Sequence, residues 1–296
     1  MKKQKQKTIL LFLLIPVLEL LIFNVYPLLR VLISSFYSMS YTNSEGFVLF
    51  ENYVKAMFSA EYNKAIFVSG YYMVAACVQV ILALILAIVL TKSKFSNVFK
   101  AILVIPYMIN GIAVGYIFKL FYTRGYVLDT LLGIIGVNTE LLPFWLRDQA
   151  INNWALAFAS VWRYTGLSLI IFIGAISSIE KTLFDASSID GAGYFQQVRF
   201  IILPNIKRVV YLNLMLSVVS SLSEFELPYA IASGGANGTA TYMTLIYRIA
   251  FTERKIGLAS AMVIILLLQI ALFSLLLLEV PKFLARIYEN KRGIEQ

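Results

Sequence analysis

The chain has 296 residues, of which 60% are hydrophobic and 14% charged, and its mean hydropathy is +0.80. A soluble domain needs far less apolar material for its core, so this composition indicates a protein that is solvated by lipid. The absence of His and the presence of one cysteine, Cys77, exclude a disulfide framework and make metal-dependent enzymes poor candidates. A net charge of +9 does not indicate a nucleic acid partner, because the basic residues alternate with apolar spans.

Six stretches are apolar enough to cross a bilayer, for which about 20 residues are needed. The first follows a lysine-rich start and runs past Pro16 and Pro27 without a small-residue cleavage site, so it is expected to be a retained helix and not a signal peptide. We therefore predict an all-α integral membrane protein with one transmembrane domain over residues 1–296. Its expected spans are 8–36, 66–91, 98–121, 154–178, 207–233 and 256–281.

The distribution of basic residues gives these spans a direction. If the N-terminus lies inside, the cytoplasmic tails and loops together hold about twice as many Lys and Arg residues as the outside loops, as the positive-inside rule requires. Both termini are therefore predicted to be cytoplasmic. The long outside loop 122–153 is interrupted by glycines and Pro143, and we expect a short interfacial helix near Val127–Ile135.

The cytoplasmic stretch 179–204 is predicted to form a knob of two short helices. Leu183–Ile189 has the pattern of an amphipathic helix, which Gly191 and Gly193 interrupt because glycine tolerates the positive φ of a helix C-cap. Tyr194–Leu203 is expected to form a second helical piece, and Pro204 to break it just before the next span. The small side chains of this knob would let a partner's backbone approach closely.

The spacing in this stretch resembles the signature loop of binding-protein-dependent ABC permeases. In that family the pattern is Glu-Ala-Ala, three residues, Gly, nine residues and Ile-x-Leu-Pro; here Asp185-Ala-Ser is followed by Gly191 and then by Ile201-x-Leu203-Pro204. Asp185, Ser187, Glu180 and Ala236 depart from the usual Glu, Ala, Pro and Pro. Further features resemble the maltose and multiple-sugar permeases: Tyr26-Pro27, Ser34-Ser35-Phe36, Ile105-Pro106-Tyr107, Gly234-Gly235 and Asn237-Gly238-Thr239-Ala240-Thr241.

The resemblance implies the core of a type I ABC importer permease in the plasma membrane of a prokaryote, with this loop as the coupling helix that docks on an ATPase subunit. It also implies a second homologous permease, a dimer of ABC ATPase subunits that bind ATP and Mg, and an extracytoplasmic solute-binding protein. The chain has no phosphate-binding G-x-x-x-x-G-K-[ST] loop, so we expect a non-catalytic subunit without a cofactor or metal. The coupling role carries over to Asp185, Ala186, Ser187, Asp190, Gly191, Ala192, Gly193, Tyr194, Ile201, Leu203 and Pro204.

Ionisable side chains within the spans are candidates for a transport path, because each costs about 2.5–3.5 kcal/mol at bilayer depth and usually faces a cavity or a partner. Arg163 lies near the middle of the fourth span, and Glu224 and Glu226 lie in the outer half of the fifth. Arg163 is expected either to form an interhelical ion pair with these carboxylates or, with Glu224, to face the hydroxyl groups of a sugar. Glu19 in the first span is predicted to make a hydrogen bond to a neighbouring helix.

Polar residues of the third to fifth spans complete this path. Asn110 and Gly111, which follow Pro106, indicate a helix that is distorted near the middle of the membrane. In the fifth span polar residues recur at three- and four-residue spacings, which predicts one polar face. The sugar permeases that the chain resembles build their site from the Pro-Tyr helix and the helices on either side of the coupling loop. The positions carried over are Tyr107, Asn110, Gly111, Ser160, Arg163, Tyr164, Ser220, Ser221 and Glu224.

These features predict a permease subunit of an ATP-driven importer for sugars or oligosaccharides. A charged or non-sugar cargo, such as glycerol phosphate or an acidic saccharide, is the alternative within the same class. An ion-coupled secondary transporter would need inverted repeats and paired broken helices, which the sequence does not display. An intramembrane enzyme would need a nucleophile or metal constellation, and a chain without His offers none that we recognise.

Overall fold

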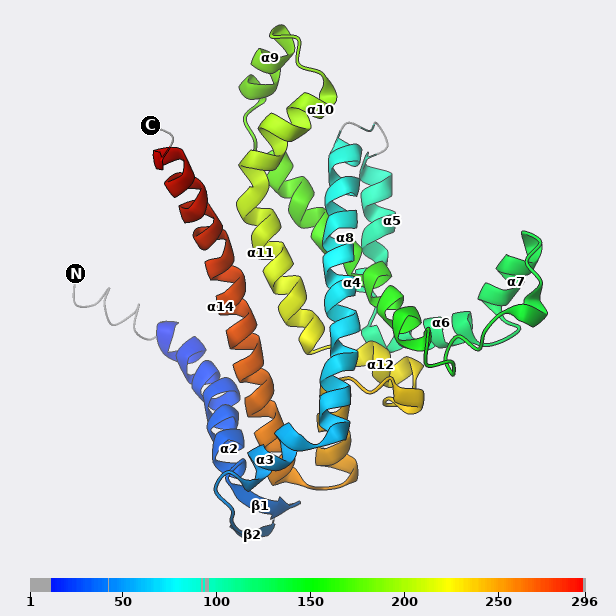
Figure 1. Ribbon diagram of the computed structural model, residues 1–296, viewed down its shortest axis with the longest axis vertical. Helices are drawn as coiled ribbons and strands as arrows, with labels where there is room; N and C mark the ends of the chain where they lie inside the picture. The colour runs from blue at the N-terminus through cyan, green and yellow to red at the C-terminus, as the bar shows by residue number, and fades with distance from the viewer. Residues whose placement is uncertain (1–11, 42, 92, 94–95, 295–296) are drawn as a thin grey trace. The chain divides into compact units, whose positions relative to one another are not determined.

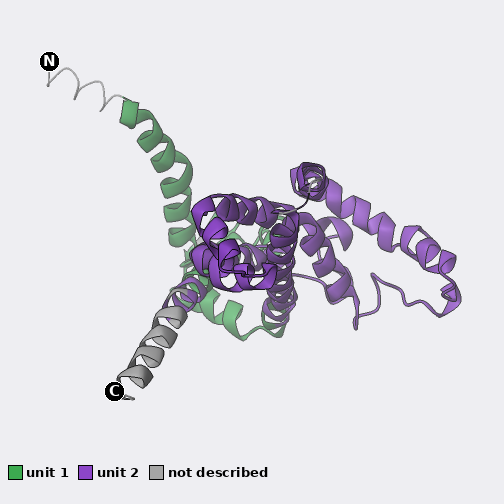
Figure 2. Cartoon of the chain, turned by 90° about the horizontal axis from the view of Figure 1, so that it is seen from above, with its two compact units in different colours: residues 1–63, 246–271 green, residues 64–245, 272–296 purple. Residues whose placement is uncertain are grey.

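The computed structural model describes residues 12–41, 43–91, 93 and 96–294. They group into two compact units, residues 1–63 with 246–271 and residues 64–245 with 272–296 (Figure 2). The single domain expected from the sequence stays a prediction, and residues 8–11 of the first predicted span lie outside the described residues.

The first unit combines apolar helices with one β-hairpin, a small departure from the all-α expectation (Figure 1). The chain is helical throughout Phe12–Ser34. The two strands pair antiparallel, with a bulge between Ser38 and Met39. The elements are η1 (Leu21–Val25, a π-helical turn), α2 (Tyr26–Ser34), β1 (Tyr37–Ser40), β2 (Asn43–Phe47), α3 (Glu51–Phe58), the start of α4 (Ala60–Thr91), η5 (Arg248–Thr252, also π-helical) and the first part of α14 (Ile256–Ile294).

Side-chain contacts hold the hairpin within this unit. Asn52 Nδ2 donates hydrogen bonds of 2.9 Å to the carbonyl oxygens of both Ser35 and Tyr37. Gly257 lies so close to the Tyr37 carbonyl that a Cβ atom there would overlap it. Glu19 is exposed and has no hydrogen-bond partner among the described residues, so the hydrogen bond predicted for it is not formed within this unit.

The second unit is helical in its described part. Its elements are the remainder of α4, α5 (Ser96–Met108), α6 (Gly111–Tyr122), α7 (Val127–Ile134), η2 (Thr139–Leu141), α8 (Asn152–Ser177), α9 (Lys181–Ile189), α10 (Tyr194–Gln197), η3 (Val198–Ile202), α11 (Leu203–Leu222), α12 (Glu226–Ile231), η4 (Ala236–Gly238), the start of α13 (Tyr242–Tyr247) and the end of α14.

Over the described residues, five helical stretches are long and apolar enough to cross a membrane, and α5 with α6 qualifies as a sixth, bent pair. These two helices meet at 98°, so the third predicted span is broken and not straight. The break lies at Ile109 and Asn110, three residues beyond Pro106. Asn110 Oδ1 accepts hydrogen bonds from the N–H groups of Ile112 (2.9 Å) and Ala113 (3.4 Å) and thereby caps the new helix.

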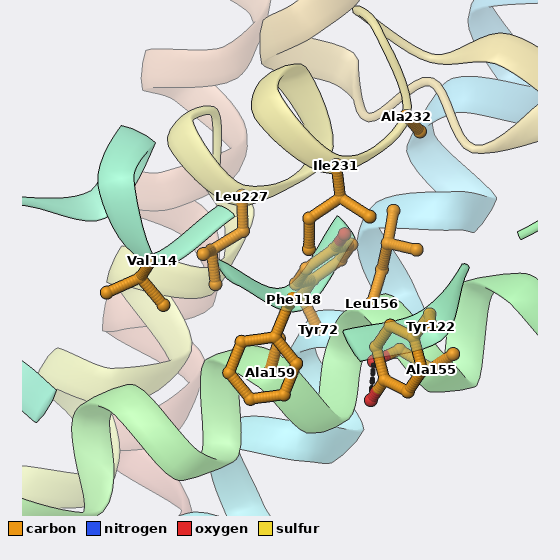
Figure 3. Close-up of a cluster of buried hydrophobic side chains, with 10 residues drawn as sticks. All are labelled: Tyr72, Val114, Phe118, Tyr122, Ala155, Leu156, Ala159, Leu227, Ile231 and Ala232. Carbon is orange, nitrogen blue, oxygen red and sulfur yellow. Dashed lines mark hydrogen bonds between the residues drawn. The ribbon is translucent and has the colours of Figure 1, made fainter. Parts of the chain in front are cut away.

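The fifth predicted span has a short interruption at residues 223–225, where α11 ends at Leu222 and α12 begins at Glu226, but Tyr194–Ile231 still qualifies as one apolar stretch without a sharp bend. The two short helices that follow the breaks, α6 and α12, lie side by side (Figure 1), and Gly115 lies directly against Ala230. Figure 3 shows the buried cluster that they share with α4 and α8, in which Tyr122 Oη donates to the Ala155 carbonyl at 2.9 Å. Its residues are Tyr72, Val114, Phe118, Tyr122, Ala155, Leu156, Ala159, Leu227, Ile231 and Ala232.

A second buried cluster joins α4, α8 and α11. It includes Ala83, Phe172 and Ile206, and Phe184 of α9 packs against it. On another side of α8, Gly166 lies against the backbone of α5, where a Cβ atom would overlap the Leu103 carbonyl. Close packing therefore sets the distances between the helices of this unit.

Pro204 does not break the helix as predicted. The chain is helical from Tyr194 onward, passing through the π-helical turn η3, in which the Leu203 N–H donates to the Val198 carbonyl. Pro204 stands in the first turn of α11, where a missing N–H is well tolerated. Gly191 adopts a φ of +77°, as predicted for a helix C-cap, whereas Gly193 has a φ of −71° and precedes α10.

Candidate functional site

A cavity of about 220 Å³ lies within the second unit, between α4, α8 and α11, with Tyr107 of α5 at its wall. The wall mixes hydroxyl, amide and carboxyl groups with small and branched apolar side chains. Among the predicted substrate-path residues, those that line it are Tyr107, Ser160, Tyr164, Ser220, Ser221 and Glu224. The other polar residues of the wall are Tyr72, Gln79, Ser168, Asn213 and Ser217.

One end of the cavity holds Glu224, which is 5% exposed. Its carboxylate accepts a hydrogen bond from Tyr164 Oη at 3.2 Å and one from the Leu227 N–H at 3.3 Å. The second bond comes from α12, so it exists because the helix is interrupted after Leu222. Tyr164, which donates to this carboxylate, lies beside Tyr107, and the centroids of the two rings are 6.3 Å apart. A fixed acceptor therefore stands next to aromatic surface.

Arg163 is turned away from this wall and pairs with Glu226, at 2.6 Å between Nη1 and Oε2. Nη1 also donates to Tyr164 Oη at 3.1 Å, and the guanidinium lies 5.0 Å from the centre of the Tyr164 ring. The sequence left open whether Arg163 pairs or faces cargo, and the structure forms the ion pair, with Glu226 and not Glu224. Glu224 and Glu226 are two residues apart and point to different sides, Glu224 to the cavity and Glu226 to Arg163.

Asn110 and Gly111 support this arrangement without lining the cavity. Asn110 caps α6, as described above. A Cβ atom at Gly111 would overlap both the Glu226 carboxylate and the Arg163 guanidinium. Gly111 therefore makes room for the ion pair, which explains the choice of residue at the break.

The sequence analysis did not predict that α4 forms part of the cavity wall. Gln79 Nε2 donates to the Tyr164 carbonyl at 3.0 Å and to Ser168 Oγ at 2.6 Å. Ser168 Oγ in turn donates to Asn213 Oδ1 at 3.2 Å, which links three helices. The sequence feature that could have indicated this wall is Gln79, a side-chain amide in the uncharged run 66–90. A polar group inside the membrane is costly unless it is paired, so an amide there indicates a partner or a cavity.

The stretch predicted to couple to an ATPase lies at the opposite end of α11 from α12 and is tied together by side chains (Figure 1). Gln197 Nε2 donates to Ser187 Oγ at 3.0 Å and to Ser188 Oγ at 3.1 Å, so α10 holds α9. Tyr194 Oη donates to the Ile88 carbonyl of α4 at 2.8 Å. Of the predicted coupling residues, Ser187, Ala192, Tyr194 and Ile201 are half-buried, and Asp185, Ala186, Asp190, Gly191, Gly193, Leu203 and Pro204 are exposed.

The loop that carries α7 has its own polar centre. Arg124 donates to the carbonyl oxygens of Leu142 and Thr139, and Asp129 accepts from the Gly125 N–H at 2.8 Å and from Trp145 Nε1 at 2.9 Å. Burial of the Asp129 carboxyl acts to raise its pKa, but these hydrogen bonds and the charge of Arg124 outweigh burial and hold the pKa below its ordinary value. The loop has a helix where the sequence predicted one.

No group of three or more His, Cys, Asp or Glu side chains in the described part of the chain could hold a metal ion. That the chain carries no cofactor stays a prediction. The groups that line the cavity can bind and orient a hydroxylated molecule, because they offer both donors and acceptors beside apolar surface.

Comparison with known proteins shows which family the sequence matches. The profile of the family described as "Binding-protein-dependent transport system inner membrane component" matches residues 79–285. The probable ABC transporter permease protein YurN of Bacillus subtilis is 29% identical over 273 residues, which are 90% of each chain. The trehalose/maltose transport system permease protein MalF of Thermococcus litoralis is 28% identical over 240 residues, 80% of each chain.

A third relative and one solved structure extend the comparison. The lactose transport system permease protein LacF of Rhizobium radiobacter is 26% identical over 212 residues, 70% of this chain and 71% of that one. A chain of a bacterial alginate ABC transporter, crystallised with an alginate pentasaccharide-bound periplasmic protein, has a TM-score of 0.81 over 93% of this chain and 94% of its own, at 19% identity. That likeness shows a shared fold.

Proposed function

The chain belongs to the family of binding-protein-dependent transport system inner membrane components, and from this premise we propose that it is a permease subunit of an ATP-driven importer for sugars or oligosaccharides. It is a membrane-embedded permease with several apolar helices, in the fold of type I importer permeases. In this role the subunit forms half of a translocation path and carries out no chemistry itself. ATP and Mg are bound by partner ATPase subunits.

The cavity between α4, α8 and α11 is the observation that carries the choice of cargo. Among the described residues that line it, Glu224 is the only ionisable acid and no basic side chain is present. Arg163, which could have bound an anionic group, is paired with Glu226. The wall therefore suits neutral hydroxyl groups better than a phosphate or an acidic saccharide. Relatives named for maltose and trehalose and for lactose support the same class of cargo.

The stretch 185–204 is proposed to be the contact with the ATPase. It lies at one end of the unit, and its most exposed apolar side chains, Ile189 and Phe195, are 87% and 86% exposed. The Tyr194 hydrogen bond ties this surface to α4, and α10 continues through η3 into α11, so a displacement of the loop would move helices that line the cavity. A second homologous permease and an extracytoplasmic solute-binding protein complete the proposed complex, with both termini in the cytoplasm.

The test is ATP hydrolysis by the assembled complex in proteoliposomes, with the solute-binding protein added and a panel of neutral sugars, acidic sugars, amino acids and inorganic anions. Stimulation by a neutral sugar is the expected result. Stimulation by amino acids or inorganic anions alone would contradict the sugar assignment. Uptake by this chain alone, without an ATPase, would contradict the importer and favour an ion-coupled transporter.

A further inference from the structure

Two buried side chains of the cavity wall have hydrogen-bonding groups left over. Tyr72 of α4 and Asn213 of α11 are 1% and 4% exposed. Neither Tyr72 Oη nor Asn213 Nδ2 has a hydrogen-bond partner among the residues that the structure describes, and both residues line the cavity. Leaving a buried donor unpaired is costly, so such groups call for an explanation.

The unpaired group on Asn213 follows from the chain of bonds that fixes it. Gln79 Nε2 must face the Tyr164 carbonyl, which can only accept, and the same nitrogen donates to Ser168 Oγ. Ser168 uses its own hydrogen toward Asn213 Oδ1. Rotating the Asn213 amide would exchange its two ends and leave the oxygen unpaired instead of the nitrogen. In either case one amide group of Asn213 remains available.

Gln79 adds an acceptor to the same end of the cavity. Both of its assigned bonds use the nitrogen, and within the described residues nothing donates to its Oε1. Its side chain is 3% exposed and lines the cavity. All three residues thus line one cavity, each with a hydrogen-bonding group left over, and none of them carries a charge.

Asn213 and Gln79 stand away from the Glu224 end of the cavity, whereas Tyr72 lies toward it. Asn213 and Glu224 stand eleven positions apart on or just beyond α11, which is roughly 16 Å at the helical rise of about 1.5 Å per residue. Tyr72 and Gln79, seven positions apart on α4, bridge roughly 10 Å of that length. Between Tyr72 and Gln79 the wall contributed by α4 consists of Ala75 and Ala76, whereas α11 contributes the hydroxyl groups of Ser217, Ser220 and Ser221.

We propose that Tyr72, Gln79 and Asn213 form a second binding subsite for an uncharged, hydroxylated part of the cargo. This deepens the function proposed above and rests on it. A hydroxyl group both donates and accepts, so two different hydroxyl groups of one sugar can pair with Tyr72 and, roughly 10 Å away along α4, with Asn213 and Gln79. Among the described residues of this wall, no cation is present for a phosphate or carboxylate. The subsite makes α4 a specificity-determining wall in addition to the helices beside the coupling loop.

The test compares two tyrosines. Tyr72→Phe removes an unpaired hydroxyl from a residue that lines the cavity, and Tyr211→Phe removes an unpaired hydroxyl from a residue of α11 that does not line it. Uptake is measured in proteoliposomes holding the full complex, with the sugar that stimulates ATP hydrolysis most in the panel above. We expect Tyr72→Phe, Asn213→Leu and Gln79→Met each to lower uptake roughly threefold to tenfold, and Tyr211→Phe to leave it unchanged.

Monodeoxy analogues of the same sugar separate binding from a structural role. For the analogue that lacks the hydroxyl bound by Tyr72, wild type and Tyr72→Phe should transport at equal rates. If Tyr72 had only a structural role, Tyr72→Phe would lower the uptake of every analogue by the same factor. Wild-type uptake in all three cavity variants, alongside impaired uptake in Glu224→Gln, would overturn the subsite and leave the proposed function standing. If no sugar stimulated the wild-type complex, both would be overturned.

Discussion

The cavity wall and the coupling stretch 179–204 place their side chains in opposite environments. At the cavity, polar residues such as Ser168 and Asn213 are 1% and 4% exposed, and the helices touch through small residues. In the coupling stretch, Ile189 and Phe195 are almost fully exposed, while polar side chains hold the short helices together. The cavity therefore depends on packing within the unit, and the loop presents a surface whose apolar tip is left for a partner to cover.

The packing around the cavity should be the more sensitive of the two regions. Gly166→Ala places a Cβ atom against the backbone of α5, which cannot move as a side chain end can, so we expect a loss of about 3 kcal/mol or failure to fold. Gly174→Ala, on the same helix with open space around it, is the matched control and should melt like wild type. Equal melting temperatures for the two purified variants would show that helix contact does not set the stability.

The coupling stretch should lose function without losing its fold. Proline cannot adopt the φ of +77° found at Gly191, and Asp185→Arg reverses an exposed charge on α9. We expect each variant to lower ATP-driven uptake more than about tenfold, a loss of at least about 1.4 kcal/mol of coupling, with normal membrane insertion. Normal uptake in cells that carry either change would show that this surface does not couple.

The ion pair beside the cavity should matter more than one at the surface. Glu226→Gln leaves the largely buried Arg163 without its carboxylate; because the Glu226 side chain is 42% exposed, we expect a loss of about 1–3 kcal/mol. Glu61→Gln breaks the Arg248 pair, in which both side chains are more than 40% exposed, and should cost under about 1 kcal/mol. Thermal unfolding of both variants measures the difference, and a larger loss for Glu61→Gln would reverse the ranking.

The smallest effect is expected in the α7 loop as the pH is lowered. The pKa of Asp129 is held below its ordinary value, so its ionised form stabilises the loop above an ordinary pKa of about 3.9. That contribution is lost as the pH falls below this value and through the folded pKa. The protection of amides 125–129 against hydrogen exchange, taken relative to the intrinsic exchange rate at each pH, should fall accordingly, and Asp129→Asn should remove this fall in protection. An unchanged pH profile in Asp129→Asn would show that another group titrates.

Features that depend on local sequence were predictable. The length of an apolar run, the positive φ at Gly191 and the helix distortion at Asn110 and Gly111 are properties of a few neighbouring residues. The angle of 98° was not, because it depends on how the helix that Asn110 caps packs against α12. The site roles carried over from the family resemblance stay predictions.

Two features of the site could not be settled from the sequence, for the same physical reason. The partner of Arg163 was left open, because the choice between an ion pair and the cargo depends on how α8 packs against the fifth span. In the structure Glu226 pairs with Arg163, and Glu224 lines the cavity. Gln79 was missed because its partner Ser168 is 89 residues away, and no local pattern connects them.

The π-helical turn at Val198–Ile202 lies between the helices α9 and α10 of the coupling stretch and the cavity wall, and it sets how α11 is rotated about its axis relative to α10. An α-helix advances about 100° per residue, so a single extra residue turns everything beyond it by that amount. A helical wheel drawn from the polar face of α11 and continued back to Tyr194 is therefore out of register by one position. Deleting one residue from this turn would leave Gln197 bonded to Ser187, so the contact between α9 and α10 would stay intact. The same deletion would rotate Asn213 away from Ser168, so a different face of α11 would line the cavity.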